Sequence, residues 1–312
     1  MSLNHTSHSM ANPSSVNISE LSQAYGRGEN ISQLLSVRHP DLKREEVIEI
    51  AYDIQSGSYS KIALANQDQL KQYAKEIHDL CKEYIIEGDI VLDCGAGELT
   101  TLSALSQHLP QHSRLLACDI SLSRLRMGQR FAAQFMRADL AADLKLFVAD
   151  MGCMPLTDDC VDVVFTSHAL EPNHGREACL LKELLRIARR HLILFEPSWE
   201  HANEAMRGRM IEHGYVRDLP HHIQEAGGCL LSVKPLPHSI NPMNPTYCYI
   251  VETSNQSSRQ GRTAHTFQCP RSGYPLQQRS TYWWSREGGW AYPEIEGISC
   301  LRAKHGVLMS HG

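Results

Sequence analysis

The sequence predicts an α/β protein built on a doubly wound parallel sheet, with a helical N-terminal extension and a small β-rich C-terminal domain. Three observations support this class. Short apolar runs alternate with segments of helical periodicity from residue 89 to about residue 200, as in sheets whose parallel strands are joined by helices. The first apolar run ends in the glycine-rich turn DCGAGE, residues 93–98. A polar stretch then separates residues 89–253 from an aromatic-rich C-terminal block.

The composition is that of a globular protein with a sizeable core. Of the 312 residues, 42% are hydrophobic, and the net charge of −5 gives no overall attraction to nucleic acid or acidic lipid. No apolar run approaches the ~20 residues that span a bilayer, and residues 1–20 lack the features of a signal peptide. Ten scattered cysteines fit free thiols in a reducing compartment. We therefore expect a cytoplasmic protein with a disordered tail over residues 1–20.

Residues 21–88 are expected to form a helical extension. Apolar residues recur at helical spacing over 41–54 and again over 66–85, and QSGSYSK, residues 55–61, interrupts the pattern.

Parallel strands and helices then follow in alternation. The expected strands cover 89–95, 114–119, 144–150, 161–170 and 191–197. The expected helices cover 99–109, 121–135, with Ser121 as N-cap, and 176–189. Residues 228–237 and 245–253 read as two further strands without a helix between them. They predict an antiparallel pair at the edge of the sheet.

Three acidic residues, Asp93, Asp119 and Asp150, end the first three strands. Ligands of open α/β sheets bind at the carboxyl ends of the strands, and Gly95 and Gly97 allow the backbone to approach such a ligand. Asp119 is placed to accept ribose hydroxyls and Asp150 an adenine amino group. A dinucleotide would prefer G-x-G-x-x-G, whereas Glu98 follows the second glycine here and would repel a pyrophosphate. The charges favour a cationic adenosine derivative.

Residues 88–200 resemble a class I S-adenosylmethionine-dependent methyltransferase. VLDCGAGELT (91–100) is similar to the first motif of that family, LLACDIS (115–121) to its ribose-binding motif, and residues 147–171 to its adenine-side and fourth-strand motifs. Leu99 departs from the third glycine of many members. The resemblance implies S-adenosyl-L-methionine as cofactor on a Rossmann-like seven-stranded sheet, with a lid segment that includes Tyr59. The expected cofactor-binding residues are Asp93, Gly95, Gly97, Asp119, Ile120, Asp150, Met151, Ser167 and Tyr59.

The acceptor side is expected after the fourth strand, where His168, Glu171 and His174 are the candidate catalytic residues. His168 comes first because the fourth strand brings it next to the transferred methyl group, and a histidine can take a proton near neutral pH. Glu196 and His201 follow the fifth strand as further candidates. The Asn-Pro-Pro-Tyr motif of amide and exocyclic-amine methylation is missing, which leaves oxygen, carbon and ring-nitrogen acceptors open. NPMNPT, residues 241–246, is either a rigid hairpin or a contact to a polar substrate.

The C-terminal block, residues 266–312, follows a polar linker over 254–265. It resembles the small zinc-ribbon-like domain of methyltransferase activator subunits, and this resemblance implies docking on the chain's own catalytic domain. Its cysteines, Cys269 and Cys300, are too few for a tetrahedral zinc site, so no metal is expected. Six basic residues interleaved with aromatics between 262 and 312 leave RNA contact as an alternative.

The function predicted from these features is methylation of a small polar acceptor, such as a sugar or a surface-glycan precursor. The segment IAYDIQSGSY, residues 50–59, is also similar to methyltransferases of bacterial surface polysaccharide synthesis. The alternatives are methylation of tRNA or rRNA with a fused activator domain, and a non-catalytic scaffold that binds S-adenosylmethionine. No membrane partner is expected.

Overall fold

The computed structural model describes residues 16–238, 241–253 and 267–312. The expected tail lies outside the described residues up to residue 15, and the first helix begins at Ile18, inside the segment predicted as tail. The expected linker, 254–265, also lies outside the described residues. The chain divides into two compact units, one ending at Gln55 and one beginning at Ser56.

The first unit is a cluster of three short helices. They are α1 (Ile18–Gly26), α2 (Ile31–Arg38) and α3 (Arg44–Ile54). The side chains of Asn17 and Asn30 accept the backbone N–H three residues further on and so cap α1 and α2. Buried Leu21, Leu35 and Val47, one from each helix, share one small core.

Two helices of the predicted extension belong to the second unit, α4 (Ser58–Ala65) and α5 (Gln67–Cys81). The interruption predicted over 55–61 is therefore shorter than expected, because α4 already begins at Ser58. Gly57 supplies the positive φ of +91° at the N-cap of α4, a conformation that glycine adopts without strain.

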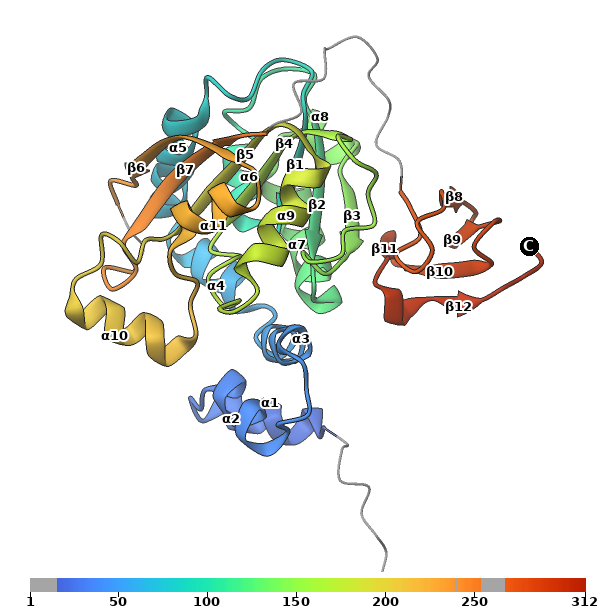
Figure 1. The fold of residues 1–312 in the computed structure, drawn as a ribbon, viewed down its shortest axis with the longest axis horizontal. Coiled ribbons are helices and arrows are strands. Elements are labelled where there is room, and N and C mark those ends of the chain that lie inside the picture. The colour runs from blue at the N-terminus through green and yellow to red at the C-terminus, as the bar shows by residue number, and fades with distance from the viewer. Residues whose placement is uncertain (1–15, 239–240, 254–266) are drawn as a thin grey trace, which may run out of the picture. The chain divides into compact units, whose positions relative to one another are not determined.

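The main sheet runs in the order β6-β7-β5-β4-β1-β2-β3 (Figure 1). Neighbouring strands from β3 to β5 pair in parallel, whereas β7 pairs antiparallel with both β5 and β6. The α/β alternation and the antiparallel edge pair that the sequence predicts are confirmed. The strands are, in chain order, β1 (Ile90–Cys94), β2 (Arg114–Asp119), β3 (Lys145–Val148), β4 (Val161–Ser167), β5 (Ala188–Pro197), β6 (Cys229–Pro235) and β7 (Thr246–Glu252).

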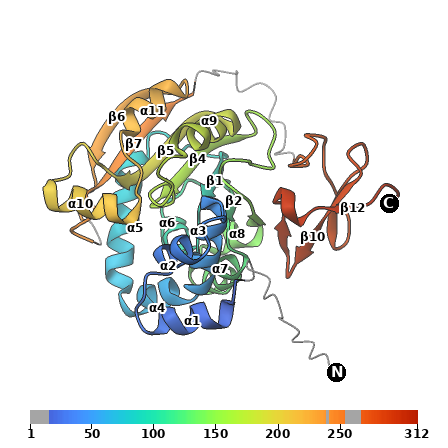
Figure 2. The ribbon, with the colours of Figure 1, turned by 60° about the horizontal axis from the view of Figure 1, so that its bottom comes forward.

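Helices cover both faces of this sheet (Figure 2). Successive residues of β1 point to opposite faces, so Leu92 packs in the core under α9 and α11 while Val91 packs in the core under α5, α6 and α7. These helices and those beside them are α6 (Thr100–Leu105), α7 (Leu122–Phe135), α8 (Ala138–Ala142), α9 (Glu177–Ile187), α10 (Glu204–His213) and α11 (Leu219–Glu225).

Two of the predicted helix boundaries can be compared directly with the structure. Ser121 caps α7 as expected, since its hydroxyl accepts the N–H of Arg124 at 3.1 Å. The helix predicted over 176–189 ends at Ile187 instead, because β5 begins at Ala188 and pairs there with Val161.

The C-terminal block folds as a small β-rich module. Its core includes the fully buried Tyr292 and the nearly buried Trp284, and Cys269 lies with its sulfur 3.3 Å from the Tyr292 hydroxyl. The strands are β8 (Gln277–Gln278), β9 (Tyr282–Ser285), β10 (Trp290–Ile295), β11 (Ile298–Cys300) and β12 (Val307–Leu308).

Strand β11 extends the main sheet, because it pairs in parallel with the edge strand β3 (Figure 1). The pairing continues past β11, where the N–H of Leu301 donates to the Val148 carbonyl at 3.0 Å. Phe267 contacts the ring of Phe147 edge to face at 5.1 Å, and Arg126 of α7 pairs with Glu296. The module thus covers an edge that would otherwise expose unpaired backbone groups.

Across the three described ranges, no helix combines the length and the apolar character that crossing a membrane requires. The same residues contain no group of three or more His, Cys, Asp or Glu side chains that could hold a metal ion.

Candidate active site

The glycine-rich turn joins β1 to α6 at the carboxyl end of the sheet. The N–H groups of Gly95 and Ala96 donate to the Cys118 carbonyl at 2.8 and 2.9 Å, which ties the turn to β2. Gly95 and Gly97 have φ angles of +83° and +54°, so both positions favour glycine. Leu99, where a third glycine was considered, also has a positive φ of 55° and is fully buried. Its apolar contacts offset the ~1–2 kcal/mol cost of that conformation.

Two of the three strand-end acids meet beneath this turn. The carboxylate of Asp119 accepts the N–H of Gly97 and the N–H of Ser121, both at 2.9 Å. Asp93 is buried, and burial followed by repulsion from Asp119 raises its pKa to about 8. A cationic ligand beside Asp93 would therefore restore its charge and be bound by it.

The third acid, Asp150, follows β3 at the carboxyl end of the sheet, where its backbone is close to that of Asp119. Its side chain has hydrogen-bond partners of its own. The backbone joins them, because the N–H of Ala149 donates to the Asp119 carbonyl at 3.1 Å. Nη2 of Arg176 donates to both carboxylate oxygens of Asp150, at 2.9 and 3.1 Å, and the N–H of Gly152 donates to Oδ1. An adenine amino group at this position would share the carboxylate with Arg176.

Glu98, which the sequence suggested would face the ligand, is among the residues that line the candidate cavity described below. It is also buried under the start of α4. Its carboxylate accepts the N–H of Gly57 at 2.8 Å, the N–H of Tyr59 at 3.4 Å, and both the N–H at 2.8 Å and the hydroxyl of Ser60. Glu98 thus caps the N-terminus of α4, where an anion is favoured, and fixes that helix to the glycine-rich turn.

A cavity of about 360 Å³ opens between α4, α5 and the carboxyl ends of β1 and β4, a size within the range of small-molecule sites. Of the residues predicted to bind the cofactor, Gly95, Ser167 and Tyr59 line it. Met151 lies beside it, because its terminal methyl is 3.4 Å from the place a Gly95 Cβ would take. Asp93, Gly97, Asp119, Ile120 and Asp150 are not among the lining residues.

Arg124 is a residue of this region that the sequence did not indicate. Its guanidinium carbon lies 4.7 Å from the centre of the Tyr59 ring, and its Nη1 lies 3.9 Å from the Asp119 carboxylate. The guanidinium also occupies the space that a Cβ on Gly97 would need. A ligand in the cavity beside the glycine-rich turn would thus meet the backbone of Gly95 and the Arg124 cation, whereas Asp93 and Asp119 lie buried beneath the turn.

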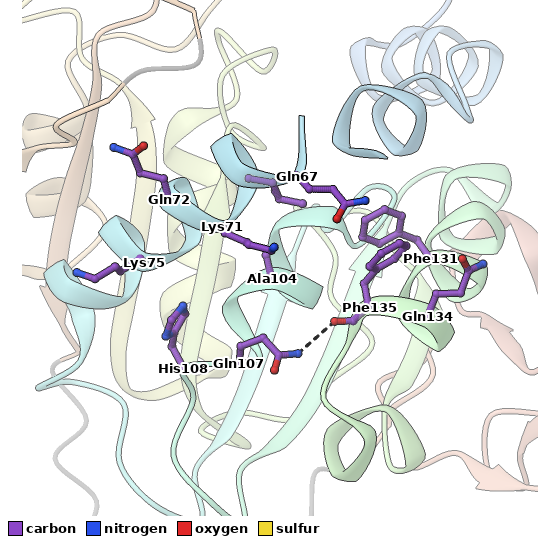
Figure 3. A pocket seen from close by; sticks show the side chains of 11 residues that line it. Gln67, Lys71, Gln72, Lys75, Ala104, Gln107, His108, Phe131, Gln134 and Phe135 are labelled. Carbon is purple, nitrogen blue, oxygen red and sulfur yellow. Dashed lines mark hydrogen bonds between the residues drawn. The ribbon is translucent and has the colours of Figure 1, made fainter. Parts of the chain in front are cut away.

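A second, larger cavity of about 650 Å³ lies away from this turn (Figure 3). It is lined by side chains of α5, α6 and α7, among them Leu70, Phe131 and Phe135. It contains none of the predicted site residues and no acidic side chain, so it is not the candidate active site.

His168 and Glu171 both line the 360 Å³ cavity and form a hydrogen-bonded pair. His168 Nδ1 is 2.9 Å from the Glu171 carboxylate, and its Nε2 is 3.1 Å from the Thr246 hydroxyl. Burial lowers the pKa of His168, but the charge and hydrogen bond of Glu171, with the charge of Glu196, outweigh it, so this pKa lies above its usual value. The φ of His168 is +54°, a strained conformation typical of functional sites.

Glu196, at the end of β5, holds the loop that carries His168. Its buried carboxylate accepts the Thr166 hydroxyl at 2.8 Å and the N–H groups of Ala169, Leu170 and Glu171 at 3.0–3.1 Å. Burial raises its pKa to about 7. Glu196 therefore positions the His168–Glu171 pair.

His174 and His201 are not brought to the cavity. His174 is half-exposed and bonds Glu177 at 2.8 Å, and His201 stacks on Tyr247 with ring centroids 4.1 Å apart. The other side of the cavity is formed by Arg209, Tyr215, Asn241 and Asn244. The asparagines belong to the segment 241–246 that was considered as a substrate contact, whereas nothing in the sequence indicated Arg209 and Tyr215.

Comparisons with known proteins show what the chain is similar to. Residues 91–191 match the profile of a family described as a methyltransferase domain. No curated protein matches the chain.

Several solved structures are similar to part of this chain. One is a complex between the Haloferax volcanii Trm112 methyltransferase activator and a methyltransferase, with 18% identity over 65% of this chain and 97% of that one and a TM-score of 0.50. Others are a methyltransferase from Aquifex aeolicus, with 19% identity over 56% and 88% of the two chains and a TM-score of 0.45, and the magnesium protoporphyrin IX methyltransferase of Synechocystis, with 14% identity over 60% and 84% and a TM-score of 0.47.

Residues 91–191 therefore resemble a methyltransferase domain, and the parallel part of the sheet that they form fits this match. S-adenosylmethionine is the cofactor expected for such a domain. None of these comparisons specifies a methyl acceptor.

Proposed function

We propose that the chain methylates a small polar acceptor, a sugar or a surface-glycan precursor, at a hydroxyl oxygen. The observation that carries the proposal is the single cavity lined both by Gly95 of the cofactor turn and by the His168–Glu171 pair. A hydroxyl loses its proton as it is methylated, so a base beside it accelerates the reaction.

The chain's own residues have distinct roles in this scheme. S-adenosylmethionine, when bound, supplies a methyl group on a sulfonium, and the carbon–sulfur bond breaks as the carbon–oxygen bond forms. His168 Nε2 exchanges its contact with the Thr246 hydroxyl for the acceptor hydroxyl and takes the proton. Glu171 orients the ring through Nδ1 and stabilises the imidazolium. Asn241 and Asn244 offer amide donors and acceptors to a polyhydroxylated ligand.

The test is incubation with methyl-labelled S-adenosylmethionine and separate small-molecule, RNA and protein fractions of a lysate. We expect label in the small-molecule fraction, and a loss of about 10²–10⁴-fold in rate for His168→Gln, the range of general-base catalysis. His174→Gln is the matched control, because His174 follows on the same loop and is outside the cavity. Its rate should stay within about threefold of wild type.

Three results would contradict this proposal. Label in RNA alone would support the tRNA or rRNA alternative, and absence of label with tight binding of S-adenosylhomocysteine would support the scaffold. Equal losses of rate for His168→Gln and His174→Gln would show that the effect is not specific to His168, and the assignment of His168 as the base would lose its support. The RNA alternative is less favoured because Arg271 and Arg279 lie over Trp290 and Trp284, at 4.3 and 5.4 Å, instead of leaving these rings open for stacking.

We further propose that the C-terminal module is a built-in counterpart of an activator subunit. The support is its pairing with β3 and the neighbour in which a methyltransferase is complexed with an activator. Phe267→Ala should lower both the melting temperature and the methylation rate, since Phe267 contacts Phe147 and Trp283. Tyr274→Ala, at an exposed ring of the same module, should change neither.

A further inference from the structure

The acceptor side of the cavity contains a guanidinium, that of Arg209, whose hydrogen-bond partners among the described residues are neutral. Arg209, on α10, donates from Nε to the Asn244 side-chain oxygen at 3.3 Å and from Nη1 to His213 Nε2 at 2.9 Å. Among the residues that the structure describes, no carboxylate forms an ion pair with Arg209 within 4.0 Å. A partly buried guanidinium without a counter-charge attracts an anion.

The surroundings of Arg209 keep its charge uncompensated. Burial, followed by the charge of Arg209, lowers the pKa of His213, so this imidazole stays neutral and accepts from the guanidinium. Burial, with the charge of Glu171, raises the pKa of Tyr215, so its phenol is also neutral; it hydrogen-bonds both Asn244 and Arg209. Two carboxylates act on His213 by their charge, Glu212 and Glu171. Neither forms an ion pair with Arg209 within 4.0 Å, and Glu171 is already bonded to His168.

The other arginine of the cavity differs in this respect. Arg124, on the cofactor side, lies 3.9 Å from the Asp119 carboxylate. Arg207, two residues before Arg209 on α10, donates to the Trp199 and Glu200 carbonyls and is outside the cavity. Arg209 is thus the cavity-lining arginine without an acidic partner.

Arg209 and His168 line the same cavity of about 360 Å³. Glu171 is hydrogen-bonded to His168, and its charge acts on both Tyr215 and His213. A small ligand can therefore reach Arg209 with one group and His168 with another.

We propose that the acceptor carries an anionic group, a carboxylate or a phosphate, which Arg209 binds together with Asn244 and Tyr215 while the hydroxyl to be methylated lies at His168. This inference rests on the proposed methylation of a small polar acceptor. It narrows that class from polar molecules in general to acidic ones, such as sugar acids or sugar phosphates. The methyl group moves from the sulfonium to the acceptor oxygen, the hydroxyl proton goes to His168, and the anionic group is unchanged.

The experiment begins with the labelled small-molecule product of the full-length enzyme. We expect that product to bind an anion-exchange resin at neutral pH. Treatment with alkaline phosphatase distinguishes the two sources of charge: a phosphate is removed and the label elutes as neutral, whereas a carboxylate survives phosphatase and is neutralised by carbodiimide coupling to an amine.

Kinetics with the purified acceptor then test Arg209 itself. Arg209→Gln should raise KM about 10²-fold, as expected for losing hydrogen bonds to a charged group, with kcat changed less than about threefold. Arg209→Lys should recover part of the affinity, and Arg207→Gln is the matched control. Affinity for S-adenosylhomocysteine, measured by calorimetry, should be the same in all variants within about twofold.

The outcomes separate this inference from the proposed function. A neutral or cationic product, or an unchanged KM for Arg209→Gln, overturns the anionic acceptor and leaves the methylation of a small molecule standing. Failure to label any small molecule, although S-adenosylhomocysteine binds, overturns both.

Discussion

Substitution of Glu98 by alanine tests whether α4 is fixed to the glycine-rich turn as the structure indicates. Glu98 is 1% exposed and accepts hydrogen bonds from the backbone of Gly57, Tyr59 and Ser60, which lie 38 to 41 residues before it. Alanine removes every acceptor and leaves these N–H groups without an intrahelical partner, since they are at the start of a helix.

The expected loss of stability comes mainly from the two short hydrogen bonds, each 2.8 Å long, that the N–H groups of Gly57 and Ser60 donate to Glu98. A hydrogen bond to a charged acceptor contributes about 1.5–3 kcal/mol. Ser60 is buried, so its N–H would lose its partner without gaining water, whereas the neighbouring Tyr59 is 44% exposed and its N–H can be hydrated. We therefore expect a loss of about 3 kcal/mol in the free energy of unfolding, or in the local opening of α4 if that segment opens first.

Two assays measure this loss. For a unit of this size, about 3 kcal/mol corresponds to a fall of ~6–12 °C in melting temperature. Hydrogen exchange of the amides of residues 57–60 reports the local opening, and it should accelerate about 10²-fold. Glu83→Ala, at an exposed glutamate, is the control and should change neither. If both the melting temperature and the exchange of these amides match the control, Glu98 does not hold α4 and the assigned contacts are wrong.

Three further predictions concern the turn and the base. Gly95→Ala should weaken binding of S-adenosylhomocysteine at least tenfold in calorimetry, because its φ is +83° and the new Cβ would lie 2.3 Å from that of Ala169; unchanged binding would contradict the geometry of the turn. Glu171→Gln should lower the pKa of His168 and shift the acid limb of the pH–rate profile to lower pH, since the neutral imidazole is the active base and Glu171 raises its pKa; a shift to higher pH would refute the pairing. Asp93 has a pKa of about 8 against an unfolded value near 3.8, so the folded state keeps a proton that the unfolded state has lost, and stability should decline from about pH 4 to pH 8 by at most ~6 kcal/mol. Asp93→Asn should flatten this decline in denaturant titrations at several pH values, and a slope equal to that of wild type would exclude Asp93 as its source.

The sequence predicts the main sheet because its signals are local. Apolar runs of four to seven residues mark β1 to β4, and the same runs place Asp93, Asp119 and His168 at or next to the carboxyl ends of strands. In a parallel sheet the carboxyl ends of the strands lie at the same edge, independently of the conformation of the connecting loops. The cofactor side of the site is therefore accessible from the sequence, although the sequence does not predict that Arg176 binds Asp150.

The acceptor side depends on contacts between distant segments, which periodicity does not report. Arg209 and Tyr215 belong to α10 and the loop after it, and their hydrogen bonds to Asn244 join them to the start of β7. Glu98 shows the same limit. Its position after two glycines suggested a ligand contact, and it does line the cavity, but the sequence did not indicate that it accepts hydrogen bonds from the helix that begins at Ser58.

The two sides of the site are mechanically linked through one contact. The place of a Gly95 Cβ is filled by the side chain of Ala169, and Ala169 belongs to the loop that Glu196 holds and that presents His168 and Glu171. Because protein interiors are close-packed, a change in the glycine-rich turn displaces this loop and the base with it. Cofactor affinity and acceptor turnover are therefore expected to fall together when Gly95 is altered, whereas an Arg209 variant, at the far end of the same cavity, should alter acceptor affinity alone.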